Sequence, residues 1–517
     1  MKSKECKQIT NKQEYILFAV MSVITGLFCL GTSPLIHAMG TDSEVFYMMG
    51  KGMVDGKVAY RELFDHKGLY LYFFNAMGVA IDAVFGVEIG VCLVEMIFIF
   101  ANLCCVYKLC VGIGLECNFS VISTLIFLAL SQNYFTAQGG NCVETYAMTF
   151  QLIALVFMYR IMCEESEQKI FWYMMIQGAC SGICLFIRAN LVIMWIPFGI
   201  YLFMKLLKEK KEKVLVRALF GLLAGVALSA VPVMAYGLYY SCIEEMYFAM
   251  FSFNLKYVAL GASGANIGVY LSSILKNPIV LVLAISVFGT ISVLVDKKFG
   301  IGVRLMYVGM VLVSALSILS TGMIRGHYYQ YMIPFCIPAI IMIVVFCRKC
   351  LSVAWEKPIL RCLGIAVVLF GTLLVNGRII IRTVLYEQSE TYRFEQITET
   401  CAEYVRKSGV DNPDLLVTGN VVGFYHAVDI IPENQYFYIP SIIYEIWGEP
   451  VDAQAASILN GDTEFVVVGY YKSTDSGEIY GVEEIDQQLV KALSGYRLLY
   501  ESDVIRDRQY CLYQKAD

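Results

Sequence analysis

The feature that most restricts the fold of this chain is a series of long apolar segments. Crossing a bilayer as a helix takes about 20 residues, and eleven segments are predicted to do so. Only 16% of the 517 residues are charged, whereas soluble domains carry about 25%. The sequence therefore predicts a polytopic α-helical membrane protein with spans at residues 15–37, 88–111, 117–137, 143–163, 170–187, 189–206, 216–240, 277–295, 301–320, 330–347 and 359–376.

Charge and cysteine content exclude several classes of protein. The net charge of −5 argues against a general nucleic-acid binder. The 18 cysteines fall mostly inside the apolar segments and lack the spacing of metal ligands. Few of them fall in polar segments, so the sequence does not predict the disulfide framework of a small secreted protein.

The distribution of Lys and Arg predicts the orientation in the membrane. Residues 69–86 are apolar but contain Asn75 and Asp82, and they are predicted to lie at the interface rather than to cross the bilayer. The Lys-rich segment 205–217 and the basic N-terminus then share one side, which the positive-inside rule makes cytoplasmic. Because no small-residue cleavage site follows the first apolar segment, the sequence predicts a retained anchor in the plasma membrane. The first loop, residues 38–87, is then extracytoplasmic.

The composition changes after the last predicted span. Residues 1–379 are assigned to a transmembrane domain and residues 380–517 to a small extracytoplasmic α/β domain, because strand-like and helix-like segments alternate there. The predicted helices are residues 392–407 and 483–493, and the predicted strands are residues 415–417, 465–468 and 496–500.

The first extracytoplasmic loop gathers acids, bases and cations directly after the first span. Thr41 and Glu44 have capping-box spacing, so a short amphipathic helix is predicted to begin there, and Glu44 is interpreted as its cap. Asp42 stands at the head of this helix. Its carboxylate is placed to accept a proton at the water–lipid boundary, and complementing the helix dipole is an equally good explanation of it.

A second polar group, Asp65-His66-Lys67, closes the same loop. Lys67 is interpreted either as an interfacial lysine whose ammonium lies among the headgroups or as a phosphate ligand. Further polar residues occur at span ends on the same predicted side, and a lipid-headgroup anchor is an alternative for Arg188. Basic and aromatic residues facing a carboxylate suit a phosphate-bearing, lipid-borne substrate. These residues are Glu144, Arg188, Asn190, Asn254, Lys256, Tyr257, Arg325, His327 and Tyr328.

These motifs resemble those of GT-C membrane glycosyltransferases, in the protein O-mannosyltransferase and aminoarabinose-transferase-like superfamily. Asp42 followed by Tyr60-Arg61-x-x-Phe64-Asp65-His66-Lys67-Gly68 is similar to the first loop of that family. The segment Arg325-Gly326-His327-Tyr328-Tyr329 is similar to its late outer loop, and Arg188-x-Asn190 to its middle outer turn. The resemblance covers roughly residues 10–380 and implies a GT-C-like fold with about 11 transmembrane helices.

The resemblance also implies a function, namely inverting transfer of a sugar from a polyprenyl-phosphate donor on the extracytoplasmic face. It implies Asp42 as the general base and Lys67 as a ligand of the donor phosphate. The chain departs from the family where Ser43 separates Asp42 from Glu44, and where Gly68 stands in place of a common proline. These departures leave the role of Glu44 and the local turn open.

The sequence leaves several features of the expected site undecided. The acceptor is a polysaccharide, a lipid or a protein, and membrane lipids surround the site. A divalent cation held by Asp42, Glu44 and His66 is left open, since the chemistry does not require one. A transporter or flippase of lipid-linked sugars and a non-catalytic scaffold or receptor are the alternatives. The residues expected to bind substrate are Lys67, His66, Asp65, Arg61, Arg188, Asn190, Arg325, His327, Tyr328, Glu144 and Glu44.

Overall fold

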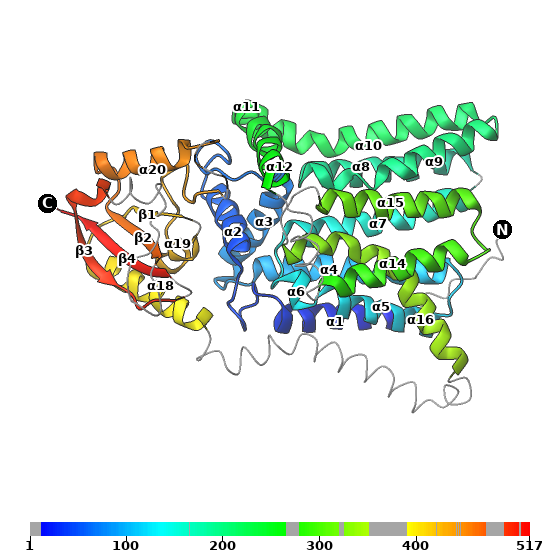
Figure 1. Ribbon diagram of the computed structural model, residues 1–517, viewed down its shortest axis with the longest axis horizontal. Coiled ribbons are helices and arrows are strands. Elements are labelled where there is room, and N and C mark those ends of the chain that lie inside the picture. The colour runs from blue at the N-terminus through cyan, green and yellow to red at the C-terminus, as the bar shows by residue number, and fades with distance from the viewer. Residues whose placement is uncertain are drawn as a thin grey trace.

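The computed structural model shows a bundle of long helices with a small sheet at one end (Figure 1). Most of the helices lie side by side along the long axis of the molecule, and the sheet caps the end from which α2 and α3 project. The structure describes residues 12–164, 166–264, 279–319, 325–350, 390–419, 421–440, 442, 444, 446–471, 491–505 and 508–516.

Among the described residues, seven helical segments are long and apolar enough to cross a membrane. They are α1 (Lys12–Cys29), α4 (Gly90–Gly112), α7 (Val143–Cys163), η1 with α9 (Ala189–Val192 and Trp195–Lys208), α10 (Glu212–Tyr239), α15 (Ile301–Leu319) and η3 with α16 (Gly326–Cys336 and Ile337–Cys350). Shorter apolar helices are α3 (Leu69–Phe85), α5 (Cys117–Ser131) and α14 (Ile279–Val295), and α8 (Glu167–Leu185) packs along α10.

Every predicted span that falls in the described residues coincides with a helix, and the span predicted at 359–376 lies outside them. The largest difference is at the first span, where α1 ends at Cys29 rather than at residue 37. Gly31 lies so close to the Ala38 carbonyl that a Cβ would be 2.2 Å from its oxygen, and Pro34 follows. The chain therefore folds back on itself after Leu30 instead of continuing as a helix.

Helix α2 (Thr41–Val54) lies between the bundle and the sheet. The predicted capping box is wrong, because Gly40 is the N-cap and no side chain caps the helix. The Glu44 carboxylate instead accepts a hydrogen bond from the backbone N–H of Gly423, far along the chain. The remaining short helices of the bundle are α6 (Tyr134–Ala137), α11 (Ile243–Tyr247), η2 (Phe248–Ser252) and α12 (Phe253–Gly264).

The described residues from 390 to 516, here called the C-terminal unit, form a four-stranded sheet with helices. The strand order is β1-β2-β4-β3; β1 runs parallel to β2, and β4 runs antiparallel to both β2 and β3. The strands are β1 (Leu415–Val417), β2 (Phe465–Tyr471), β3 (Tyr496–Glu501) and β4 (Arg508–Lys515). The helices are α18 (Glu390–Lys407), α19 (Gly423–Val428), α20 (Glu449–Asn460) and η5 (Leu493–Gly495).

The predicted helix at 392–407 and the three predicted strands are confirmed as α18, β1, β2 and β3. Strand β4 was not predicted, because its buried Tyr510, Cys511 and Leu512 are flanked by polar residues. The helix predicted at 483–493 lies almost wholly outside the described residues.

The C-terminal unit is joined to the first loop of the bundle by backbone hydrogen bonds and ion pairs. The amide of Phe64 donates to the Gln435 carbonyl at 2.8 Å, and Gln435 Nε2 donates to the Tyr60 carbonyl at 3.0 Å. Lys51 pairs with Asp429, and Lys57 pairs with Glu433. The Phe64 ring lies 5.0 Å from Trp447 and 5.6 Å from Tyr436.

Candidate functional site

A cavity of about 230 Å³ lies where α2, the end of the first loop and the outer turns of the bundle meet. It is called here the Asp42 pocket. The pocket contains eight of the twelve residues predicted to be catalytic or to bind substrate, although they are widely separated along the chain: Asp42, Asp65, His66, Lys67, Arg188, Arg325, His327 and Tyr328.

In the first turn of α2, the side chains of Asp42, Ser43 and Glu44 point in three different directions. Ser43 is buried and accepts a hydrogen bond at 2.9 Å from Asn141 Nδ2, which also contacts the Ser43 carbonyl at 3.2 Å. With Ser43 held on that side, Asp42 faces the pocket and Glu44 faces the C-terminal unit. Ser43 therefore separates the two carboxylates spatially as well as in sequence.

Asn141 is fixed by the buried Glu95, which accepts the Asn141 amide N–H and the Thr32 hydroxyl. Gly140 has φ +88°, and a Cβ there would lie 2.4 Å from Glu95 Oε1. The Gly139-Gly140 turn thus allows the Asn141 amide to donate its hydrogen bond to the Glu95 carboxylate. Both carboxylate oxygens of Glu95 therefore have hydrogen-bond partners, as a buried structural acid requires.

Asp42 is accessible and is accompanied by a histidine. Its side chain is 52% exposed, and Oδ2 lies 3.8 Å from Nε2 of the buried His327. The other ring nitrogen of His327 is 2.8 Å from Gln138 Oε1, which fixes the orientation of the ring. An acceptor hydroxyl can therefore reach the Asp42 carboxylate from solvent.

The Asp65-His66-Lys67 segment forms the floor of the pocket. Asp65 is 1% exposed, and its carboxylate accepts hydrogen bonds from Tyr438 at 2.5 Å and Tyr72 at 2.8 Å. Burial alone would raise the pKa of Asp65, but the Lys67 charge and hydrogen bonds from His66 and Tyr438 outweigh it and hold the pKa below its usual value. Burial and the Lys67 charge lower the pKa of His66, whose Nε2 lies 2.6 Å from Lys67 Nζ.

Arginines complete the cationic side of the pocket. Arg188 pairs with the buried Glu144 at 2.9 Å and stacks 4.5 Å from the Tyr328 ring. Gly68 brings this turn beside Lys67, since its amide bonds the Ile187 carbonyl at 2.8 Å and a Cβ would lie 1.9 Å from the Phe186 oxygen. Proline would lose that hydrogen bond, which explains glycine at position 68.

Arg325 is exposed at the mouth of the pocket, and no ion pair holds it among the residues that the structure describes.

Four of the residues expected to bind substrate do not line the Asp42 pocket: Arg61, Asn190, Glu44 and Glu144. Glu144 is buried and pairs with Arg188. Arg61 pairs with Glu245 at 3.0 Å and donates to the Tyr240 carbonyl at 2.9 Å. Asn190 lies behind Arg188 and donates to Ser317 at 3.2 Å. Glu44 lines a different cavity.

Sequence reasoning also missed pocket residues. Gln138 and Tyr438 carried no signal, because they lie in segments without a polar motif. Asn254 and Tyr257 also line the pocket; the sequence places them among the polar and aromatic residues of the predicted outer side, but not among those expected to bind substrate.

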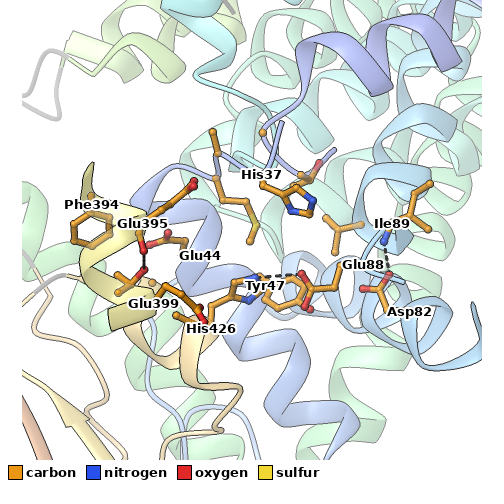
Figure 2. A pocket seen from close by; sticks show the side chains of 18 residues that line it. His37, Glu44, Tyr47, Asp82, Glu88, Ile89, Phe394, Glu395, Glu399 and His426 are labelled. Carbon is orange, nitrogen blue, oxygen red and sulfur yellow. Dashed lines mark hydrogen bonds and ion pairs between the residues drawn. The ribbon is translucent and has the colours of Figure 1, made fainter. Parts of the chain in front are cut away.

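Glu44 lines a second cavity of about 400 Å³, called here the Glu44 pocket, between the bundle and the C-terminal unit (Figure 2). His426 Nε2 lies 3.2 Å from Glu88 Oε2 on its floor. Burial raises the pKa of Glu44 to about 8 and that of Glu395 to about 7. Both carboxyl groups therefore tend to hold protons near neutral pH, so the cavity carries less negative charge than its residues suggest.

The residues considered for a divalent cation do not converge. Asp42 and His66 share the Asp42 pocket, but Glu44 lines the other cavity. Within the described parts of the chain, no three His, Cys, Asp or Glu side chains are grouped as a metal site would require. The three side chains that the sequence left open as cation ligands, Asp42, Glu44 and His66, therefore do not form a metal site together.

Neither a protein-family model nor a curated protein sequence matches this chain. Solved structures do match its fold. ArnT from Cupriavidus metallidurans bound to undecaprenyl phosphate is similar with a TM-score of 0.59 at 12% identity, covering 97% of this chain and 98% of that one. The Archaeoglobus fulgidus oligosaccharyltransferase in complex with Zn and sulfate is similar with a TM-score of 0.51 at 13% identity, covering 95% and 79%. The chain therefore has the GT-C fold of membrane glycosyltransferases.

Proposed function

We propose that the protein is a membrane glycosyltransferase that moves a sugar from a polyprenyl-phosphate donor to an acceptor hydroxyl on the extracytoplasmic face. The observation that carries this proposal is the Asp42 pocket, in which one accessible carboxylate faces Lys67, Arg188 and Arg325 at the end of an apolar bundle. The complex of ArnT with undecaprenyl phosphate supports a lipid-phosphate partner for the same fold.

The cations account for the leaving group. As the bond between the anomeric carbon and the phosphate oxygen breaks, both electrons remain on the lipid phosphate. The positive charges of Lys67 and Arg325 stabilise this negative charge. Arg188, which stacks on Tyr328, stabilises it as well. Cations fixed beforehand in a water-poor site stabilise developing charge without reorganisation.

Asp42 accounts for the acceptor. The acceptor hydroxyl gives its proton to the Asp42 carboxylate while its oxygen forms a bond to the anomeric carbon. Such general-base help contributes about 10²–10⁴-fold in rate. A single displacement inverts the anomeric centre. His327 Nε2 lies 3.8 Å from the Asp42 carboxylate at the same side of the pocket.

The direct test uses purified protein in lipid vesicles with radiolabelled polyprenyl-phosphate sugars and candidate acceptors. The expected result is labelled acceptor together with free polyprenyl phosphate in equal amount. Movement of intact donor between leaflets, without cleavage of its phosphate bond, would instead show the transporter or flippase alternative. Binding of the donor without transfer or movement between leaflets would instead support a non-catalytic scaffold or receptor.

A further inference from the structure

Asp65 connects the membrane bundle to the C-terminal unit through hydrogen bonds. Its Oδ1 accepts the Tyr438 hydroxyl at 2.5 Å and its own neighbour's amide, that of His66, at 2.7 Å. Its Oδ2 accepts the Tyr72 hydroxyl from α3 at 2.8 Å. A carboxylate that is 1% exposed needs such donors, because an unsatisfied buried charge is costly.

The same groups determine where Lys67 lies. Its carbonyl accepts the Tyr60 hydroxyl at 2.9 Å, and its amide donates to Tyr72 Oη at 3.1 Å. Asp65 Oδ1 lies 3.2 Å from His66 Nδ1, and the opposite ring nitrogen lies 2.6 Å from the Lys67 ammonium. Asp65 therefore influences the Lys67 ammonium through both the backbone and the imidazole.

Tyr438 reaches Asp65 because the C-terminal unit is bonded to the loop segment that precedes Asp65. Gln435 accepts from the Phe64 amide at 2.8 Å and donates to the Tyr60 carbonyl at 3.0 Å. These bonds fix the segment three residues before Tyr438 against the segment that precedes Asp65. The hydroxyl is then directed into the Asp42 pocket, which Tyr438 lines.

We propose that Tyr438 is a positioning residue for the donor-phosphate site, so that the C-terminal unit completes the framework that holds Lys67. This inference rests on the proposed function. Tyr438 acts through Asp65 and His66, and in its absence the Asp65 carboxylate loses its shortest hydrogen bond and the Lys67 ammonium loses its fixed direction.

The test measures binding of undecaprenyl phosphate, and of undecaprenol as its uncharged counterpart, to the full-length protein in detergent. Tyr438→Phe is expected to weaken the affinity for the phosphate by on the order of tenfold, as expected for loss of a hydrogen bond to a charged group, and to leave binding of the alcohol unchanged. Tyr436→Phe is the matched control, because its hydroxyl donates to Glu449 at 3.0 Å inside the C-terminal unit. This control should bind like the wild type.

Equal affinity of Tyr438→Phe and wild type for the phosphate would overturn the inference, as would equal losses in both variants. If wild type does not prefer the phosphate to the alcohol, the proposed function fails instead. Should Tyr438→Phe not fold, Tyr72→Phe removes the hydroxyl on the other oxygen of Asp65. Its expected loss of phosphate affinity tests the same framework, and unchanged affinity there also overturns the inference.

Discussion

At the scale of single residues, replacing Asp42 by asparagine distinguishes a catalytic role of this side chain from a purely structural one. Asparagine there keeps the size of the side chain but cannot accept the acceptor's proton. Asp42→Asn is therefore expected to lower the transfer rate by on the order of 10²-fold or more at saturating donor. The measurement is the initial rate normalised to inserted protein.

Glu44→Gln is the internal control for Asp42→Asn. Glu44 lies only two residues away but lines the Glu44 pocket, where an amide oxygen can still accept the Gly423 N–H. Near-wild-type transfer is therefore expected. An active Asp42→Asn beside an inactive Glu44→Gln would reverse the assignment of the base.

Lys67 and Arg325 are expected to act on the donor rather than on the acceptor. Alanine at either position should raise the donor KM on the order of tenfold or more, because each substitution removes a charge-assisted contact to phosphate. Lys407→Ala is the matched control, since Lys407 pairs with Glu403 within α18 and does not line the Asp42 pocket. If both variants keep wild-type rates at low donor concentration, these cations only anchor headgroups.

Glu44 also makes stability depend on pH. Its pKa of about 8 in the folded protein exceeds the ordinary value of 4.5, so the folded state holds a proton that the unfolded state releases. The stability that the protonated Glu44 contributes to the folded state is fully present below about pH 4.5 and is lost as the pH rises through about 8. The unfolding temperature of wild type should therefore fall relative to Glu44→Gln between about pH 5 and about pH 9, the two values flanking this window. Parallel curves would show that Glu44 is already ionised.

The grouping of Asp42, Lys67, Arg188 and Arg325 followed from sequence because all four lie at span ends on the same predicted side. The positive-inside rule and helix length together bring such residues to one rim. Tyr438 could not be predicted in this way. Its position depends on the bonds between Gln435 and the first loop, and nothing in its local sequence distinguishes it from other tyrosines.

At the scale of elements, the close contact between the first loop and the turn after α8 joins Lys67 to Arg188. A methyl group at position 68 would lie 1.9 Å from the Phe186 carbonyl oxygen. Gly68→Ala must therefore move one segment, and a loss of about 1–3 kcal/mol in stability is expected from such overpacking. Donor affinity should fall as well, because the two cations separate. Thermal unfolding and donor binding measure the two effects.

Gly199→Ala is the control for this substitution, because a Cβ on that residue of α9 meets no atom within 4 Å. It should leave donor affinity unchanged and should not lower stability, because alanine is favoured over glycine inside a helix. A neutral Gly68→Ala would mean that the loop adjusts freely and does not fix the distance between Lys67 and Arg188.

The membrane spans were the elements best predicted from sequence, because the length of an apolar segment determines whether it can cross the bilayer. The residues at which the helices begin and end were predicted less well. Helix α1 stops at Cys29 because the chain folds back at Gly31, and α2 begins without the predicted cap because Glu44 has a partner in the C-terminal unit. In both cases a distant contact outweighs the local signal.

At the scale of the whole molecule, the orientation in the membrane can be tested with cysteines. Lys407 ends α18 in the C-terminal unit. Lys208 ends α9, which begins near the Asp42 pocket and extends about 20 Å along the bundle. Cys163 is exposed at the end of α7, which starts at Val143 beside the same pocket. Both Lys208 and Cys163 therefore lie at the end of the bundle remote from the C-terminal unit.

The expected topology is cytoplasmic for Lys208 and Cys163 and extracytoplasmic for Lys407. An impermeant thiol reagent applied to intact cells should label Lys407→Cys. It should label Lys208→Cys and the native Cys163 only after the membrane is opened, and peptide mapping identifies the modified cysteine. Labelling of positions 208 and 407 from the same side would contradict the orientation. If position 407 proved cytoplasmic, the Asp42 pocket would lack access to an extracytoplasmic acceptor, because it lies at the same end of the bundle as the C-terminal unit.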